Sequence, residues 1–279
     1  MTEFTLSNGT GIPAIGFGTF PLVKNDAYKA TRHALDVGYR HIDTAEIYDN
    51  EIEVGKAMKE SGVSREDVYL TTKLWNAHWT YETARDALEE SLKRFGTDYI
   101  DLYLIHWPGP YDRIRAVWTA MEEAVDTGKV CSIGLSNFNL HHVDNLLEVA
   151  KVKPVANQVE CNPHLQNVFL KQQCQDRDLI LEAYAPLGSS HVEDLLGDDT
   201  LKTIASAHNK TVAQIVLRWN IQRGVVVLPK SGTPSRIEEN FQVFDFELTD
   251  EEMQTIRRLN KGKRYFTEPD NADFGFLIE

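Results

Sequence analysis

Short, nearly continuous apolar segments alternate along the chain with longer segments in which apolar residues recur at helical spacing. Continuous apolar character is typical of strands that are buried on both faces, as in a parallel sheet covered by helices. The expected strands are Ile15–Phe20, Tyr39–Ile42, Val68–Leu74, Ile100–Ile105, Val130–Leu135, Val155–Val159, Leu179–Ala185 and Val225–Leu228. Eight such strands alternating with helices in 279 residues predict an α/β protein of the (β/α)8 TIM barrel type.

The remaining pattern adds helices, a hairpin and an extended C-terminus. Amphipathic periodicity predicts helices over Ala27–Val37, Glu53–Ser61, Tyr81–Phe95 and Ile114–Thr127. Two β-like segments around an Asn-Gly turn predict an N-terminal β-hairpin over Glu3–Ala14. No linker or low-complexity segment interrupts the chain, so we expect one domain over residues 1–279, with an extra C-terminal helix and tail.

A doubly wound sheet is the alternative fold. It would require a glycine-rich phosphate turn after its first strand, and IGFGTF at Ile15–Phe20 has two of the glycines without the third. We therefore interpret this segment as a buried strand that packs closely against its neighbours.

Charge and cysteine content narrow the possible partners. With 42 acidic and 29 basic residues, the net charge of −13 argues against nucleic acid and anionic membranes. No apolar span reaches the roughly 20 residues that cross a membrane, and the N-terminus lacks the apolar region of a secretory signal. Three cysteines without a CxxC pair indicate free thiols packed in the core of a cytoplasmic protein. No metal-ligand pattern occurs, His141-His142 is expected to begin a solvated helix, and a monomer is the default.

Polar residues close the apolar segments at the position where barrel enzymes carry their chemistry, the C-terminal ends of the strands. They are Asp43, Lys73, His106, Ser136 with Asn137, Gln158 with Glu160, Tyr184 and Lys230. The first four sites are separated by 30, 33 and 30 residues, which is the length of one strand–helix unit of roughly 30 residues. Equal spacing predicts that these side chains lie at one height around a single rim.

The segment Tyr39–Glu51 joins a carboxylate, Asp43, to a phenol, Tyr48. Taken alone, the two residues are equally well explained as a helix cap and a packed aromatic. Lys73, on a buried strand, requires a partner, and Asp43 is placed to provide it. A lysine cation beside the phenol would lower the pKa of Tyr48, and a neutral His106 could orient a carbonyl oxygen. Such a site protonates an oxygen on which negative charge develops, and it needs an organic cofactor to complete the reaction.

Basic residues gather after the last strand, in the segment VVVLPKSGTPSRIEEN. Lys230, Ser231 and Arg236 place two cations and a hydroxyl at a strand–loop–helix junction, and Thr233 or Ser235 could cap the helix that follows. Phosphate sites are frequent at this place in barrels, and helix N-termini favour anions. The segment predicts phosphate binding.

Six segments together resemble the aldo-keto reductase family over essentially the whole chain. They read GYRHIDTAEIYDNE, TTKLWN, DLYLIHWP, IGLSNF, NQVECNPH and LPKSGTPSRIEEN, in the family's order. Within the family, the chain resembles a small microbial group that includes 2,5-diketo-D-gluconate reductases and protozoan prostaglandin F synthases.

The resemblance implies NADPH-dependent reduction of aldehydes and small ketones or dicarbonyls to alcohols. The implied catalytic residues are Tyr48 as general acid, with Lys73, Asp43 and His106. The implied substrate walls are Phe20, Ile47, Trp75 and Trp107. The implied NADPH contacts are Ser136, Asn137 and Gln158 at the carboxamide, Tyr184 against the nicotinamide ring, Thr19 and Thr44 at the inner end, Leu187 and Gly188 at the pyrophosphate, Lys230, Ser231 and Arg236 at the 2′-phosphate, and Glu239 and Asn240 at the adenine.

Two segments depart from the family pattern, and two other functions stay open. The segment PGPYDRIRAVW after Trp107 is short, which predicts an open pocket, and EAYAPLGSS lacks the Trp and Gln of many microbial members. One alternative function is a Schiff-base aldolase that acts through Lys73. The other is a cofactor-bound sensor or binding module with little turnover.

Overall fold

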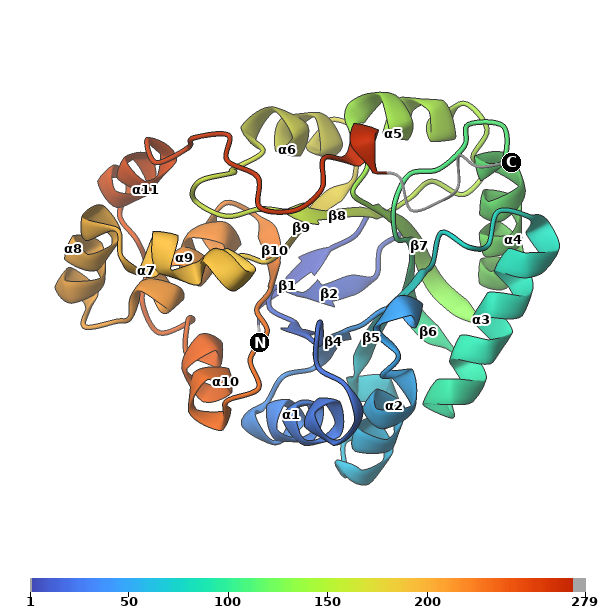
Figure 1. Cartoon of the computed structure of the whole chain (residues 1–279), viewed down its shortest axis with the longest axis horizontal. Coiled ribbons are helices and arrows are strands. Elements are labelled where there is room, and N and C mark those ends of the chain that lie inside the picture. Colours follow the sequence, from blue (N-terminus) through green and yellow to red (C-terminus); the bar gives the residue numbers. More distant parts are fainter. Residues whose placement is uncertain (1, 273–279) are drawn as a thin grey trace.

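A ring of eight parallel strands forms the centre of the molecule (Figure 1). The computed structural model describes residues 2–272. The strands are β3 (Phe17–Gly18), β4 (His41–Asp43), β5 (Tyr69–Leu74), β6 (Ile100–Ile105), β7 (Val130–Ser136), β8 (Ala156–Glu160), β9 (Ile180–Tyr184) and β10 (Val225–Leu228). They neighbour one another in chain order, and a parallel bridge between Ile15 and Val227 joins the first edge to the last. The predicted (β/α)8 barrel is confirmed.

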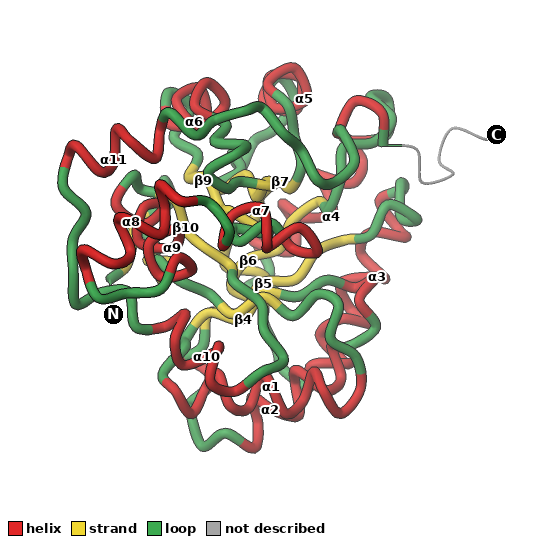
Figure 2. The backbone as a smooth tube through the Cα atoms, turned by 60° about the vertical axis from the view of Figure 1, so that its left-hand side comes forward, coloured by secondary structure: helices red, strands yellow, loops and turns green. Residues whose placement is uncertain are grey.

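Helices surround the ring, as the tube view shows (Figure 2). They are α1 (Lys24–Val37), α2 (Glu51–Glu60), α3 (Tyr81–Phe95), α4 (Ile114–Asp126), α5 (Leu140–Leu147), α6 (Val168–Gln175), α7 (Val192–Leu196), α8 (Asp199–His208), α9 (Val212–Gln222), α10 (Pro234–Phe241) and α11 (Asp250–Arg257). Helix α1 begins earlier than expected because its first turn is polar and lies outside the apolar pattern. Within residues 2–272 no helix is both long and apolar enough to cross a membrane.

The predicted hairpin is present and closes one end of the barrel. Strands β1 (Glu3–Thr5) and β2 (Gly11–Pro13) pair in antiparallel register. Leu6 and Ile12 pack with apolar residues of β6 and β10 in a single buried cluster inside the ring. Figure 1 shows this hairpin through the ring, on its far side. The opposite end, formed by the C-terminal ends of the strands, is left for ligand binding.

Close packing explains the glycines of IGFGTF. A Cβ atom on Gly16 would lie 2.7 Å from both His41 Nδ1 and Leu228 Cδ2, so only glycine fits. The expectation of core cysteines is correct for Cys161 and Cys174 but wrong for Cys131, which is exposed. Cys131 lines a cavity of about 610 Å³ at the hairpin end, together with residues of β1 and β2.

The C-terminal segment after α11 returns across the upper part of the barrel in Figure 1 and ends, within the described residues, at the 3₁₀ turn η4 (Pro269–Asn271). The Glu160 carboxylate anchors it by accepting the backbone N–H groups of Tyr265 and Phe266 at 2.9 and 3.1 Å. The extra helix of the prediction is therefore present, and the part of the predicted tail over residues 273–279 lies outside the described residues.

Candidate active site

A buried ion pair joins the ends of β4 and β5. The Lys73 ammonium group donates to Asp43 Oδ1 at 2.8 Å and to the Thr44 backbone carbonyl at 2.7 Å. Lys73 is 1% exposed and Asp43 is 5% exposed. An unpaired charge at this depth would be strongly unfavourable, so each residue requires the other. The ion pair predicted from the 30-residue spacing is confirmed.

Tyr48 lies above this pair on the 3₁₀ turn η1 (Glu46–Tyr48). Its hydroxyl oxygen is 3.5 Å from His106 Nε2, and Lys73 Nζ is 5.3 Å from the centre of its ring. Burial and the Asp43 charge raise the pKa of Tyr48, whereas the sequence led us to expect a lowered pKa. The expectation was wrong because the phenol is buried, which disfavours the charged phenolate, and the nearby Asp43 carboxylate disfavours it further. Tyr48 is therefore a protonated donor at neutral pH.

His106, at the end of β6, is a neutral imidazole. Burial and the Lys73 charge hold the pKa of His106 well below its usual value. Its ring packs edge-on against Tyr48 and Trp75, with ring centres 5.6 and 5.3 Å apart. A neutral ring can donate one hydrogen bond without adding a positive charge to the site.

Glu46 fastens the turn that carries Tyr48 to the loop after β5. Its carboxylate accepts the Trp75 backbone N–H at 3.0 Å and a hydrogen bond from His78 Nε2 at 2.9 Å. The sequence reasoning did not select Glu46 or His78. The only signal was an acid two residues before Tyr48 and a histidine three residues after Trp75.

Amide side chains occupy the next two strands of the rim, and a tyrosine occupies the strand after them. Asn137, with a positive φ of 64° at the end of β7, donates its backbone N–H to Gln158 O at 2.8 Å and its side-chain amide to His106 O at 3.0 Å. The Tyr184 hydroxyl donates to Asn137 Oδ1 at 2.8 Å. Ser136, Asn137 and Gln158 are all buried. The structure thus brings together the residues that the resemblance assigns to the carboxamide and the ring.

Gln158 connects these amides to the ion pair. Its Nε2 atom donates to Asp43 Oδ2 at 2.8 Å and to Glu182 Oε2 at 2.9 Å. The sequence reasoning did not select Glu182, although an acid inside the apolar segment Leu179–Ala185 signals a buried carboxyl.

The β9 end and the C-terminal segment meet at Tyr184. The Phe266 ring packs edge-on against the Tyr184 ring, with centres 5.3 Å apart. Leu187 is partly buried and Gly188 has a φ of 81°, a conformation that favours glycine. Since Glu160 anchors Phe266, the last segment of the chain helps to hold the tyrosine in place.

Two exposed cations follow β10. In residues 2–272 no acidic side chain forms an ion pair with Lys230 or Arg236. Helix α10 begins after Thr233 without a side-chain cap, so the predicted cap by Thr233 or Ser235 is wrong. Instead the buried Ser231 hydroxyl accepts the Thr233 backbone N–H at 3.0 Å and shapes the turn. Free cations beside an uncapped helix start fit an anion such as phosphate.

Other polar groups near the expected nucleotide contacts also lack partners. Thr19 Oγ1 and Asn240 Oδ1 are buried and have no hydrogen-bond partner among the described residues. Thr44 donates its hydroxyl to Asn50, and Glu239 accepts from Thr211. The two orphaned oxygens and the two unpaired cations fit a large, polar, anionic ligand such as a dinucleotide.

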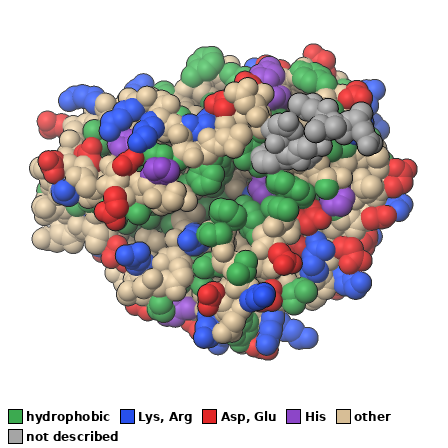
Figure 3. Space-filling view, in the orientation of Figure 1, with side chains coloured by type: hydrophobic (Ala, Val, Ile, Leu, Met, Phe, Trp, Pro, Cys, Tyr) green, Lys and Arg blue, Asp and Glu red, His purple; other side chains and the backbone are tan. Residues whose placement is uncertain are grey.

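Apolar side chains border the site. Phe20 and Ile47 are 49% and 48% exposed, and the Phe20 ring centre is 4.9 Å from that of Tyr48. Trp75 is half-buried beside His106, and Trp107 is buried. Figure 3 shows a hollow at the centre of this face, bordered by hydrophobic side chains.

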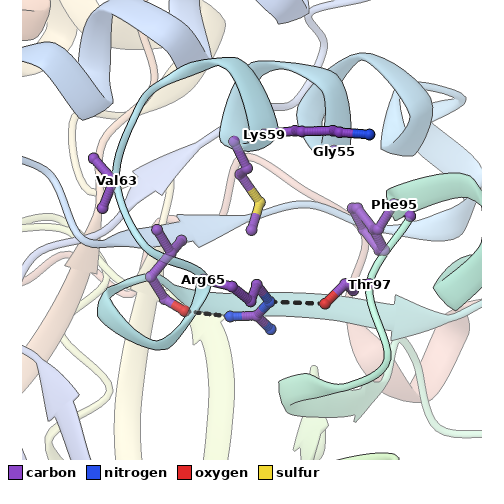
Figure 4. Close-up of a pocket in the computed structure, with 9 residues that line it drawn as sticks. Gly55, Lys59, Val63, Arg65, Phe95 and Thr97 are labelled. Atoms are coloured by element: carbon purple, nitrogen blue, oxygen red, sulfur yellow. Dashed lines mark hydrogen bonds between the residues drawn. The ribbon is translucent and has the colours of Figure 1, made fainter.

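Two other features of the described chain offer no comparable chemistry. A cavity of about 290 Å³ lies beside α2 and the end of α3 (Figure 4), but Arg65 in its wall is bound to Thr97 and to the Val68 carbonyl. His141, His142 and Asp270 place three ligand atoms within 4.8 Å at the predicted start of α5. However, His142 Nδ1 accepts the backbone N–H of the N-cap residue, which leaves the ring proton on the nitrogen that would have to bind a metal.

A (β/α)8 barrel with this set of polar side chains around one rim defines an α/β-barrel enzyme. The sequence pattern of the Aldo/keto reductase family matches residues 11–261. The chain belongs to this family, as its six motifs predict.

Individual relatives agree with this assignment. The chain is 46% identical to the glyoxal reductase of Bacillus subtilis (strain 168) over 96% of each chain. It is 45% identical to the 9,11-endoperoxide prostaglandin H2 reductase of Trypanosoma cruzi (strain CL Brener), over 96% of this chain and 94% of that one. The crystal structure of MGS-M4, an aldo-keto reductase from a Medee basin deep-sea metagenome library, is 52% identical with a TM-score of 0.96, covering 98% of this chain and 100% of that chain. The resemblance to microbial and protozoan members is confirmed.

Proposed function

We propose that the protein is an NADPH-dependent reductase that converts aldehydes, small ketones or dicarbonyls to alcohols. The observation that carries this proposal is the group at the rim: a protonated Tyr48 3.5 Å from a neutral His106, above the buried Asp43–Lys73 pair. The relatives named for glyoxal and prostaglandin H2 reduction support a reductase with a small or apolar oxygen-containing substrate.

When bound, the nicotinamide nucleotide supplies the hydride. Tyr48 donates its hydroxyl proton to the carbonyl oxygen as negative charge develops there. His106 donates from Nε2 to the same oxygen and so orients the carbonyl against Tyr48. Lys73, held by Asp43 and the Thr44 carbonyl, stabilises the tyrosinate that remains.

The nucleotide contacts follow from the resemblance and from the fit of the side chains. Ser136, Asn137 and Gln158 hold the carboxamide, and Tyr184 stacks on the ring. Lys230, Ser231 and Arg236 bind the 2′-phosphate, and the free cations support this assignment. We also propose a monomer with a single domain, and a cytoplasmic location on the ground that all three cysteines are free.

The proposal is tested by Tyr48→Phe, which keeps the ring and removes the transferable proton. Turnover of NADPH with aromatic aldehydes, methylglyoxal-like dicarbonyls, keto esters and keto-sugar acids should fall almost to zero, while NADPH binding, measured by fluorescence, stays intact. Unchanged turnover in Tyr48→Phe contradicts the assignment.

The same assays separate the alternatives. A sensor module binds NADPH without oxidising it with any member of the carbonyl panel. A Schiff-base aldolase is trapped by borohydride on Lys73 without a nucleotide, but the Asp43 partner keeps that lysine protonated and weakens this alternative.

A further inference from the structure

A second carboxyl group, Glu182, lies inside the barrel beneath the proposed site. Its residue is fully buried, and in the sheet it pairs with Gln158 of the neighbouring strand. Glu182 Oε2 accepts from Gln158 Nε2 at 2.9 Å. Glu182 Oε1 has no hydrogen-bond partner within residues 2–272. None of the proton-transfer and orienting steps of the proposed reaction uses this residue.

The nitrogen of Gln158 is shared between two carboxyl groups. It also donates to Asp43 Oδ2 at 2.8 Å. A primary amide nitrogen carries two hydrogens, so these two bonds use both of them. Turning the amide over would set its oxygen against two carboxyl oxygens and leave buried acceptors without donors, which is costly. The pair Asp43 and Glu182 therefore dictates which way the amide of Gln158 faces.

We propose that Glu182 is a positioning residue of the reductase site: together with Asp43 it holds the Gln158 nitrogen, so that the amide oxygen is the group left to accept from the carboxamide of the nicotinamide nucleotide. The inference rests on the proposed function. It adds a fifth side chain to the Asp43, Lys73, Tyr48 and His106 group, and this side chain acts through Gln158.

The charges around Glu182 favour this arrangement. Burial and the Asp43 charge raise the pKa of Glu182 to about 7, while the Gln158 hydrogen bond and Lys73 lower it. Tyr69 of β5 is a further titratable group near it, and the residue of β10 that pairs with Glu182 is the apolar Val226. Lys73 thus faces two carboxyl groups, Asp43 and Glu182.

Affinity measurements with two ligands test the role. NADPH contains the nicotinamide, and 2′-phospho-ADP-ribose has the same phosphates and adenine without it. We expect Glu182→Leu, which leaves one Gln158 N–H without an acceptor, to weaken NADPH roughly five- to tenfold and to leave the nicotinamide-free ligand unchanged. Glu182→Gln keeps the shape and an acceptor oxygen, so its effect should be smaller and in the same direction.

Glu122→Gln is the matched control for loss of a buried carboxyl. Glu122 on α4 accepts the backbone N–H groups of Lys151 and Val152 at 2.6 and 2.9 Å, and within residues 2–272 it has no hydrogen bond to a residue of the site. It should affect stability and leave both affinities unchanged. Equal weakening of both ligands in the Glu182 variants indicates a merely structural role and overturns the proposal, as does unchanged NADPH affinity in both variants.

A second readout needs no ligand. In protein labelled with ¹⁵N-glutamine, the side-chain amide signal of Gln158, assigned by its loss in Gln158→Leu, should move with pH around a midpoint of about 7. The movement should vanish in Glu182→Gln and persist in Glu122→Gln. A signal that titrates identically in all three proteins overturns the contact. If the wild type binds NADPH but reduces no carbonyl, the reductase assignment fails. The affinities for NADPH and 2′-phospho-ADP-ribose and the titration of the Gln158 signal still decide the role of Glu182.

Discussion

Two ion pairs on neighbouring parts of the barrel, Arg94–Glu51 and Lys73–Asp43, both have a buried carboxylate but differ in how many of their groups are hydrogen-bonded. Glu51 of α2 accepts hydrogen bonds from Thr72, Ser91 and Arg94, at 2.6, 3.1 and 2.6 Å. Lys73 uses two of its three ammonium hydrogens, on Asp43 and the Thr44 carbonyl. Its remaining hydrogen has no described acceptor, and the group lies near the Tyr48 ring. The Glu51 carboxylate thus has three hydrogen-bond donors, whereas Lys73 retains one ammonium hydrogen that could stabilise a negative charge formed during the proposed reaction.

Removing the cation from each pair gives the largest expected contrast. Lys73→Met leaves Asp43 buried without its cation and should cost about 3–5 kcal/mol of stability and about 10²–10⁴-fold in kcat. Arg94→Met should also lower stability, because Glu51 loses its partner, but kcat of the folded enzyme should stay unchanged. Chemical unfolding and steady-state reduction check both variants, and equal kcat losses would remove the distinction between the pairs.

The pH dependence of the free energy of unfolding should reveal Glu182, a buried carboxyl group with no cation bonded to it among the described residues. Glu182 has a folded pKa of about 7 against an ordinary value of 4.5, so the folded state binds more protons in this window. Stability from this group is therefore lost as the pH rises from about 4.5 to 7. Relative to Glu182→Gln, the wild type should lose about 3 kcal/mol between about pH 4 and pH 8. Urea unfolding at several pH values measures the difference in the free energy of unfolding between the two proteins, in which the contributions of all other titrating groups cancel. A difference that does not change with pH contradicts the raised pKa of Glu182.

The same contrast between paired and unpaired groups applies to surface cations. Arg236 has no described acidic partner, whereas Arg177 bonds to Asp144 at 2.7 Å. Arg236→Ala should weaken NADPH by about 1.5–3 kcal/mol, roughly ten- to hundredfold, and should weaken NADH far less. Arg177→Ala is the control and should alter neither. Equal weakening of the two nucleotides by Arg236→Ala would argue against a 2′-phosphate site.

The smallest expected effect concerns Glu46, which connects the turn that carries Tyr48 to the loop after β5. Glu46→Gln keeps the shape but weakens the bonds to the Trp75 N–H and to His78. We expect kcat/KM to fall about three- to tenfold, because the turn that carries Tyr48 and the loop that carries Trp75 lose the hydrogen bonds of a charged carboxylate between them. NADPH affinity serves as the internal control. A tenfold loss of NADPH affinity would place Glu46 in the nucleotide site instead.

The sequence predicts features that are set within a single segment, such as a buried strand, or by the regular spacing of strand–helix units. Continuous apolar segments identify the buried strands, and equal spacing brings Asp43 to Lys73. Features that depend on lateral register are not predictable in this way: the contact of Glu182 with Gln158 arises between two strands, and Phe266 reaches Tyr184 only because Glu160 anchors the tail. The predicted sign of the Tyr48 pKa shift was also wrong, because it depends on how deeply the fold buries the phenol and on the nearness of Asp43, which the spacing of residues does not reveal.

Closure of the ring by the pairing of Ile15 with Val227 has a consequence for the nascent chain during synthesis. The strands join one after another in chain order, yet the edge beside β3 stays unpaired until residues near 227 have been made. For most of synthesis the growing sheet therefore presents an open strand edge, the kind of surface on which chains aggregate. Because the last pairing needs residues near 227, we expect the barrel to close late in synthesis and factors that shield an open strand edge to matter most before that point.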